Sequence, residues 1–172
     1  MVRKLLSALL LFSVAVGTYA TEWKGKFLIL EHSQSRPNTW ALWRKNFNVD
    51  KVPSSVKARI ATDTKYWLYI NERLVVFEGG LKRGPEPNAT YYDEVEIAPY
   101  LQEGDNLIAV LTWHFGLNGF SHVNSGTSGL LFEAEGDGVQ VVSDKTWRGA
   151  LYGAYGETDA PKPNYRISES NI

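Results

Sequence analysis

The chain has 172 residues, of which 44% are hydrophobic and 22% are charged, values typical of one globular domain. Its formal net charge is −1, which argues against the basic surface of a nucleic-acid-binding protein. It contains no cysteine, which excludes a disulfide framework, so the fold depends on its hydrophobic core.

The N-terminus is typical of a secretory signal peptide. Arg3 and Lys4 precede an almost wholly apolar stretch at residues 5–16, and residues 18–20 (TYA) resemble a small-x-small cleavage site. The apolar stretch is shorter than the roughly 20 residues that span a bilayer. We therefore predict cleavage after Ala20, with no membrane attachment afterwards; a buried N-terminal helix is the alternative.

The mature chain would keep 152 residues, of which 16 are basic and 19 are acidic, with a net charge of −3. Export without cysteine favours a bacterial protein that is periplasmic or secreted.

Residues 21–151 read as one all-β domain. Apolar residues alternate or form short runs, with no sustained helical period. Such runs predict strands at 27–30, 40–49, 56–60, 66–70, 74–77, 91–97, 106–113, 130–134 and 139–143. This number of short strands with turn signals between them is typical of a jelly-roll β-sandwich. Residues 107–111 are apolar at every position, so we expect that strand to lie centrally.

The connections carry recognisable turn signals. Asn71-Glu72 would join two strands as a hairpin, although glycine is usual where Glu72 stands. Pro99 could open a single helical turn that Gly104 closes. Residues 152–172 are rich in glycine, proline and polar residues and predict a linker or tail.

The stretch WHFGLNGFSHVNSGTSG, residues 113–129, looks at first like an active-site loop. Ser128, however, does not stand in the G-x-S-x-G spacing of a nucleophile elbow, and a strand follows it rather than a helix. His114 and His122 are eight residues apart and do not form a zinc-binding pair. We therefore interpret the stretch as a long connection whose glycines permit turns and whose polar side chains satisfy backbone groups. Trp113, His114 and His122 are retained as candidates for lining a sugar site.

Acidic residues offer two further hypotheses. Glu94 and Glu96 share one face of a predicted strand, as on any solvated strand, whereas catalytic carboxylates face each other across a cleft. Residues 103–106 (EGDN) and 133–137 (EAEGD) place oxygen ligands in turns without matching a dedicated calcium loop. We predict no cofactor, and a structural calcium ion stays an open alternative.

Aromatic residues make up 13% of the chain. Flat rings stack on sugars and also fill the cores of sandwiches. Trp40, Trp43 and Trp113 are candidates for carbohydrate binding because a module of that kind needs exposed rings. Spacing alone favours core packing for most of the tryptophans.

Several stretches resemble one family. Residues 38–49 (NTWALWRKNFNV) resemble the opening of the non-catalytic, N-terminal β-sandwich domain of bacterial α-L-rhamnosidases. Residues 66–71 (YWLYIN) resemble its hairpin. Residues 92–106 match a signature that consists of an aspartate followed later by Leu-x-x-Gly-x-Asn. Galactose-binding-domain-like jelly rolls of several glycoside hydrolase groups share this signature. Residues 113–126 resemble a loop of the Bacteroides-type proteins, and residues 163–169 their linker toward the next domain.

The resemblance implies an accessory domain of a secreted α-L-rhamnosidase-like glycoside hydrolase. The catalytic acid and base of that family lie in an α/α barrel, so none is placed on this sequence, and the chain would be a fragment. The expected partners are the missing catalytic domain and rhamnose-containing glycans. A free-standing carbohydrate-binding module is the alternative. A complete small enzyme would need an acid and base paired in a cleft, which the sequence does not offer.

Overall fold

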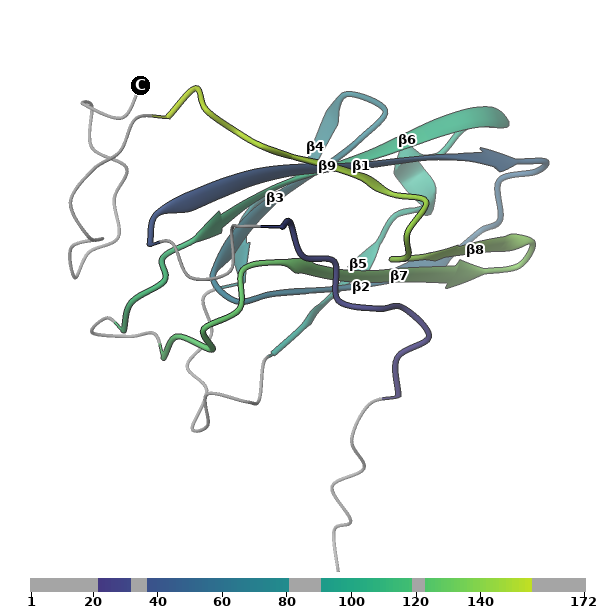
Figure 1. Ribbon diagram of the computed structural model, residues 1–172. Coiled ribbons are helices and arrows are strands. Elements are labelled where there is room, and N and C mark those ends of the chain that lie inside the picture. Colours follow the sequence, from purple (N-terminus) through teal and green to yellow (C-terminus); the bar gives the residue numbers. More distant parts are fainter. Residues whose placement is uncertain (1–21, 32–36, 81–90, 119–122, 156–172) are drawn as a thin grey trace, which may run out of the picture.

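The computed structural model describes residues 22–31, 37–80, 91–118 and 123–155. These residues form two antiparallel sheets that pack face to face (Figure 1). The prediction of an all-β sandwich is therefore confirmed. No helix in this part of the chain is long and apolar enough to cross a membrane.

One sheet has five strands and the other has four. The five-stranded sheet has the order β4 (Arg73–Gly80), β3 (Lys65–Ile70), β6 (Gly104–His114), β1 (Thr39–Val49) and β9 (Arg148–Leu151). The four-stranded sheet has the order β5 (Asp93–Glu96), β2 (Val56–Thr62), β7 (Leu130–Gly136) and β8 (Val139–Val142). A single 3₁₀ turn, η1 (Ala98–Tyr100), has Pro99 in its first turn, as predicted. The central position predicted for the apolar strand is also confirmed, since β6 lies between β3 and β1.

Apart from the exact bounds of the strands, the prediction differs from the structure at two places. Residues 27–30 make only one bridge, from Leu28 to Leu130, instead of a strand. β9 was not predicted, because its sequence RGAL is short and has no apolar alternation. It pairs with β1 at the sheet edge, where a side chain at Gly149 would meet the ring of Trp43 at 2.9 Å.

The core lies between the sheets and follows the two-residue period of the strands. In β1, Ala41, Trp43 and Val49 point inward, while the even-numbered neighbours point outward. The buried side chains of β2 have the same spacing, at Val56, Ala58 and Ile60. The inward faces of both sheets thus bury their apolar side chains against each other.

Two asparagines fix the corner between β3, β4 and β6. Asn71 and Glu72 both have positive φ, 48° and 66°, as in the type I′ turn of a tight hairpin. Asn106 is 3% exposed, and its Oδ1 accepts hydrogen bonds from Asn71 Nδ2 at 2.8 Å and from Gln102 N at 2.9 Å. Its Nδ2 donates to the carbonyls of Gln102, at 2.7 Å, and Gly104, at 3.0 Å. The Leu-x-x-Gly-x-Asn signature is therefore a structural corner.

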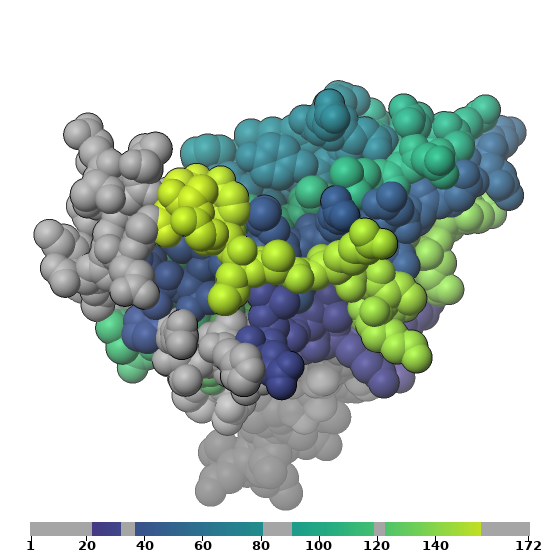
Figure 2. Space-filling view, turned by 45° about the horizontal axis from the view of Figure 1, so that its top comes forward, coloured from purple at the N-terminus to yellow at the C-terminus, as the bar shows by residue number. Residues whose placement is uncertain are grey.

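The outward face of the five-stranded sheet carries an aromatic cluster. Trp40 stacks on Trp113 and on Trp67, with centroid distances of 4.6 and 5.5 Å. Tyr152 and Tyr155, from the segment after β9, pack on this cluster. Figure 2 shows the last described residues, in yellow, lying against the surface of the sandwich. Residues 152–155 of the predicted linker are therefore packed on the domain; the rest of that linker lies outside the described residues.

Candidate functional site

The three tryptophans that were candidates for sugar stacking are buried. Trp40 and Trp43 are 4% exposed and Trp113 is 3% exposed. Trp43 points into the core, where its Nε1 donates to Thr112 Oγ1 at 2.9 Å. Trp40 and Trp113 are direct partners in the register of β1 and β6, so their rings stack on each other, and Tyr155 lies 4.5 Å from Trp40 between centroids. These side chains therefore form no exposed ridge, because Trp43 lies in the core and neighbouring rings cover Trp40 and Trp113. Their part in carbohydrate binding stays a prediction.

His114, one of the two histidine candidates, does not face the solvent either. His114 ends β6, is 3% exposed, and its Nδ1 lies 3.0 Å from Oδ2 of Asp63. Asp63, whose Oδ1 also accepts from the backbone N–H of Ser125 at 2.8 Å, was not singled out in the sequence. His114 and Asp63 together therefore anchor the connection of residues 113–129 to the turn after β2. His122 lies outside the described residues.

The polar side chains of this connection satisfy backbone groups. Asn124 Nδ2 donates to the carbonyl of Gly116 at 3.0 Å, and its Oδ1 accepts from Gly126 N at 3.1 Å. Asn118 Oδ1 accepts from Asn124 N at 2.8 Å, and Ser125 Oγ accepts from Thr127 N at 3.2 Å. The structural interpretation of the loop is confirmed for its described residues.

A cleft of about 450 Å³ lies on the outward face of the four-stranded sheet. It is lined by charged side chains of both signs and by one aromatic ring. Its lining residues are Lys24, Ser55, Lys57, Arg59, Tyr92, Glu94, Glu133, Ala134, Glu135, Gln140 and Val142. The alternation in the sequence predicted the outward face of β2, and Glu94 was expected on a solvated face. The sequence did not show that β2, β5, β7 and β8 are neighbours in one sheet.

The strand register arranges the charges of the cleft in two rows. In the first row, Lys57 of β2 stands between Glu96 of β5 and Glu135 of β7. In the second row, Arg59 stands between Glu94 and Glu133. Since alternate residues of a strand point to the same side, both rows face the solvent.

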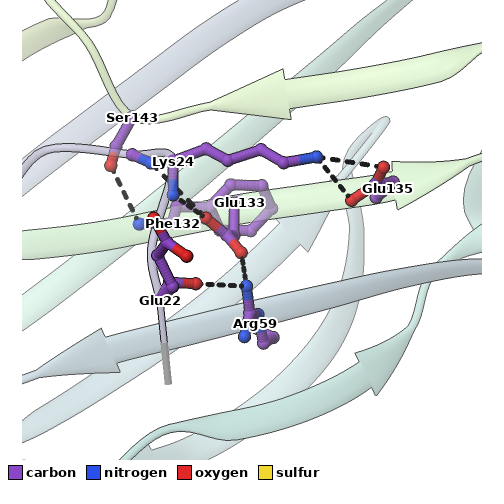
Figure 3. A network of polar contacts seen from close by, with 8 residues as sticks. Glu22, Lys24, Arg59, Phe132, Glu133, Glu135 and Ser143 are labelled. Atoms are coloured by element: carbon purple, nitrogen blue, oxygen red, sulfur yellow. Dashed lines mark hydrogen bonds and ion pairs between the residues drawn. The ribbon is translucent and has the colours of Figure 1, made fainter. Parts of the chain in front are cut away.

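The segment before β1 forms one wall of the cleft (Figure 3). Arg59 donates to the carboxylate of Glu133 and to the backbone carbonyl of Glu22, the latter at 3.1 Å. Lys24 pairs through its Nζ with Glu135 at 3.0 Å, and its backbone N–H donates to Glu133 Oε2 at 2.9 Å. These contacts hold residues 22–26 across β7 and use four of the charged groups of the cleft.

Aromatic rings flank the guanidinium group of Arg59. Its Cζ lies 4.8 Å from the ring centroid of Trp23 and 5.9 Å from that of Tyr92, within the range of cation–π interactions. The two rings meet edge to face at 5.5 Å, and both are half-buried. Neither Trp23 nor Tyr92 was selected as a site candidate in the sequence, although Tyr92 stands in the matched stretch 92–106.

Three polar side chains of the cleft are unengaged. Across the described parts of the chain, the side chains of Lys57, Glu94 and Gln140 make no hydrogen bond or ion pair. Glu96 differs, since the Ser55 hydroxyl donates to it at 2.5 Å and Val56 N at 2.7 Å, which lowers the pKa of its carboxyl. Lys57, Glu94 and Gln140 are thus available to a ligand.

Three of the carboxylates proposed for calcium are engaged in other contacts. Glu133 pairs with Arg59, and Glu135 pairs with Lys24. Asp105 accepts a hydrogen bond from Asn48 Nδ2 at 3.3 Å. Among the described residues, no three or more His, Cys, Asp or Glu side chains are grouped so that they could hold a metal ion.

Comparison with known proteins relates the sandwich to rhamnosidases. No family model matches the chain, and no curated protein sequence matches it. A crystal structure of a GH78 family rhamnosidase of Bacillus sp. GL1 is similar, with 30% identity and a TM-score of 0.67 over 79% of this chain. The similarity covers only 14% of that enzyme.

Two further rhamnosidase structures share the fold. The α-L-rhamnosidase of Aspergillus terreus matches at 22% identity and a TM-score of 0.51, over 67% of this chain and 16% of that one. The α-L-rhamnosidase of Streptomyces avermitilis matches at 14% identity and a TM-score of 0.52, over 83% of this chain and 13% of that one. The sandwich is a rhamnosidase-related domain. Its predicted N-terminal position and its Bacteroides-type origin stay predictions.

Proposed function

We propose that the chain is a non-catalytic, carbohydrate-binding accessory domain of a secreted, bacterial α-L-rhamnosidase-like glycoside hydrolase. The similarity to 14% of the Bacillus rhamnosidase, at 30% identity, carries this proposal. It relates the chain to one domain-sized part of a much larger glycosidase. Export to the periplasm or the cell exterior is part of the proposal and is supported by the signal-peptide pattern of residues 1–20.

The chemistry of the cleft supports an accessory role. Glycoside hydrolysis uses two carboxyl groups on either side of the scissile bond. Among the described residues that line the cleft, Glu133 and Glu135 are engaged with Arg59 and Lys24, which leaves Glu94 without an unengaged carboxylate partner for that task. We infer that this domain holds glycan while the reaction takes place in another domain.

Activity and binding assays on the purified chain test the proposal. An aryl α-L-rhamnoside should not be turned over, and a glycan array should show binding to rhamnose-containing glycans. Turnover that survives repeated purification would contradict the accessory role. An array without any bound glycan would contradict carbohydrate binding.

A free-standing carbohydrate-binding module is the second candidate. The unengaged side chains of Lys57, Glu94 and Gln140 favour it, because they give this chain a site of its own. The two candidates differ in their genetic context. A rhamnosidase-like reading frame continuous with this chain supports the accessory domain, and its absence supports the free-standing module.

A further inference from the structure

We propose that the cleft on the four-stranded sheet binds a neutral carbohydrate, with Lys57 and Glu94 recognising neighbouring hydroxyl groups of one sugar. This inference rests on the proposed carbohydrate-binding function and assigns it a site and a class of ligand. The site lies on the sheet opposite the one that carries the buried Trp40 and Trp113.

The position of the two side chains suits a pair of hydroxyls. Glu94 is the register partner of Arg59, and Lys57 is two residues away on the same face of β2, so Lys57 and Glu94 are diagonal neighbours. Diagonal neighbours on adjacent strands lie about 7–8 Å apart at the backbone, which leaves room for a small group between the side-chain tips. An ammonium group only donates and a carboxylate only accepts, whereas a hydroxyl does both. Two sugar hydroxyls can therefore satisfy both groups at once.

The charges of the cleft favour a neutral ligand over an acidic one. Arg59 and Lys24 already pair with Glu133 and Glu135, so among the described residues that line the cleft Lys57 and Glu94 are the charged groups without an ion pair. Lys57 also stands beside Glu96, whose carboxyl pKa it helps to lower. A carboxylate on the ligand could pair with Lys57 but would also face Glu94. Repulsion of this kind selects against acidic sugars.

The remaining lining completes a site of suitable size. The Tyr92 ring gives the apolar C–H face of a sugar a surface to pack on. Gln140 of β8 adds an amide that can donate and accept at the opposite edge. A volume of about 450 Å³ lies within the usual range of small-molecule sites.

The test combines NMR titration with three alanine variants. The probes are methyl α-L-rhamnoside and a neutral rhamnose-containing oligosaccharide, with a galacturonate-containing oligosaccharide for comparison. Backbone amide shifts should change in β2, β5 and β8. Lys57→Ala and Glu94→Ala should each raise Kd by about tenfold, the effect of losing one charge-assisted hydrogen bond. Arg44→Ala is the matched control, because it removes an exposed charge from a smaller cleft on the other sheet.

The results distinguish failure of this site assignment from failure of the proposed function. Both substituted side chains are exposed, so circular dichroism and Tm should match those of the wild type. If the wild type binds and both cleft variants bind equally well, this site assignment is overturned while the proposed function stands. Tighter binding of the galacturonate probe overturns the neutral ligand class. If the wild type binds none of the probes and no glycan on the array, both proposals fail.

Discussion

Asn106 offers the sharpest test of how this sandwich is held together. Its side chain is 3% exposed and takes part in four hydrogen bonds, two as acceptor and two as donor. They close the turn between η1 and β6 and tie it to Asn71 in the β3–β4 hairpin. Asn106→Ala removes all four bonds, whose partners are the exposed Gln102 and the half-buried Asn71 and Gly104.

The expected magnitude follows from the count of these bonds. One intramolecular hydrogen bond contributes about 1 kcal/mol net, so the loss of four should lower the free energy of unfolding by about 4 kcal/mol. The effect is a large part of the stability of a typical domain, which is about 5–15 kcal/mol. Asn48→Ala is the matched control: Asn48 is exposed and makes one side-chain bond, to Asp105 at 3.3 Å, so its loss should cost less than about 1 kcal/mol.

Urea denaturation followed by tryptophan fluorescence measures both variants. A double-mutant cycle with Asn71→Ala should give a coupling energy of about 1 kcal/mol, because the two side chains share one direct bond. If the free energy of unfolding of Asn106→Ala lies within about 1 kcal/mol of the wild-type value, the four hydrogen bonds of the corner do not stabilise the fold.

Three further predictions concern the turn, acid stability and processing. Glu72→Gly should raise the free energy of unfolding by about 0.5–1 kcal/mol in the same urea assay, because Glu72 has a φ of 66° that glycine adopts without strain. The pKa of Glu96 is lowered by the donors Ser55 and Val56, so its contribution is present above its ordinary value of 4.5 and is lost as pH falls through the lowered pKa. Thermal melts across that window should therefore show a smaller acid-induced loss of Tm in Glu96→Gln than in the wild type; equal losses would contradict this assignment. Mass spectrometry of the exported protein should find Thr21 at its N-terminus, and an intact residue 1–20 segment would rule out the cleavage.

Sequence patterns and structure agree best where local periodicity carries the information. The alternation in β2 identified Lys57 and Arg59 as outward-facing, and the solid apolar run of β6 identified a central strand. Both follow from the geometry of a single strand, in which side chains point alternately to the two faces. The turn at Asn71 and the helical turn at Pro99 were likewise visible, because they depend on the backbone preferences of a few adjacent residues.

Contacts between distant segments were decided by the tertiary structure. Spacing in the sequence did not decide whether Trp40 and Trp113 are exposed or buried. Their stacking depends on the register of β1 with β6. β9 has no pattern of its own and becomes a strand only because it pairs with the edge of β1. The cleft arises in the same way, since Glu94 meets Arg59 only where β5 pairs with β2. The sequence by itself determined most of the strands, their faces and the class of fold. The site depends on which strands become neighbours, which is settled by packing across the whole chain.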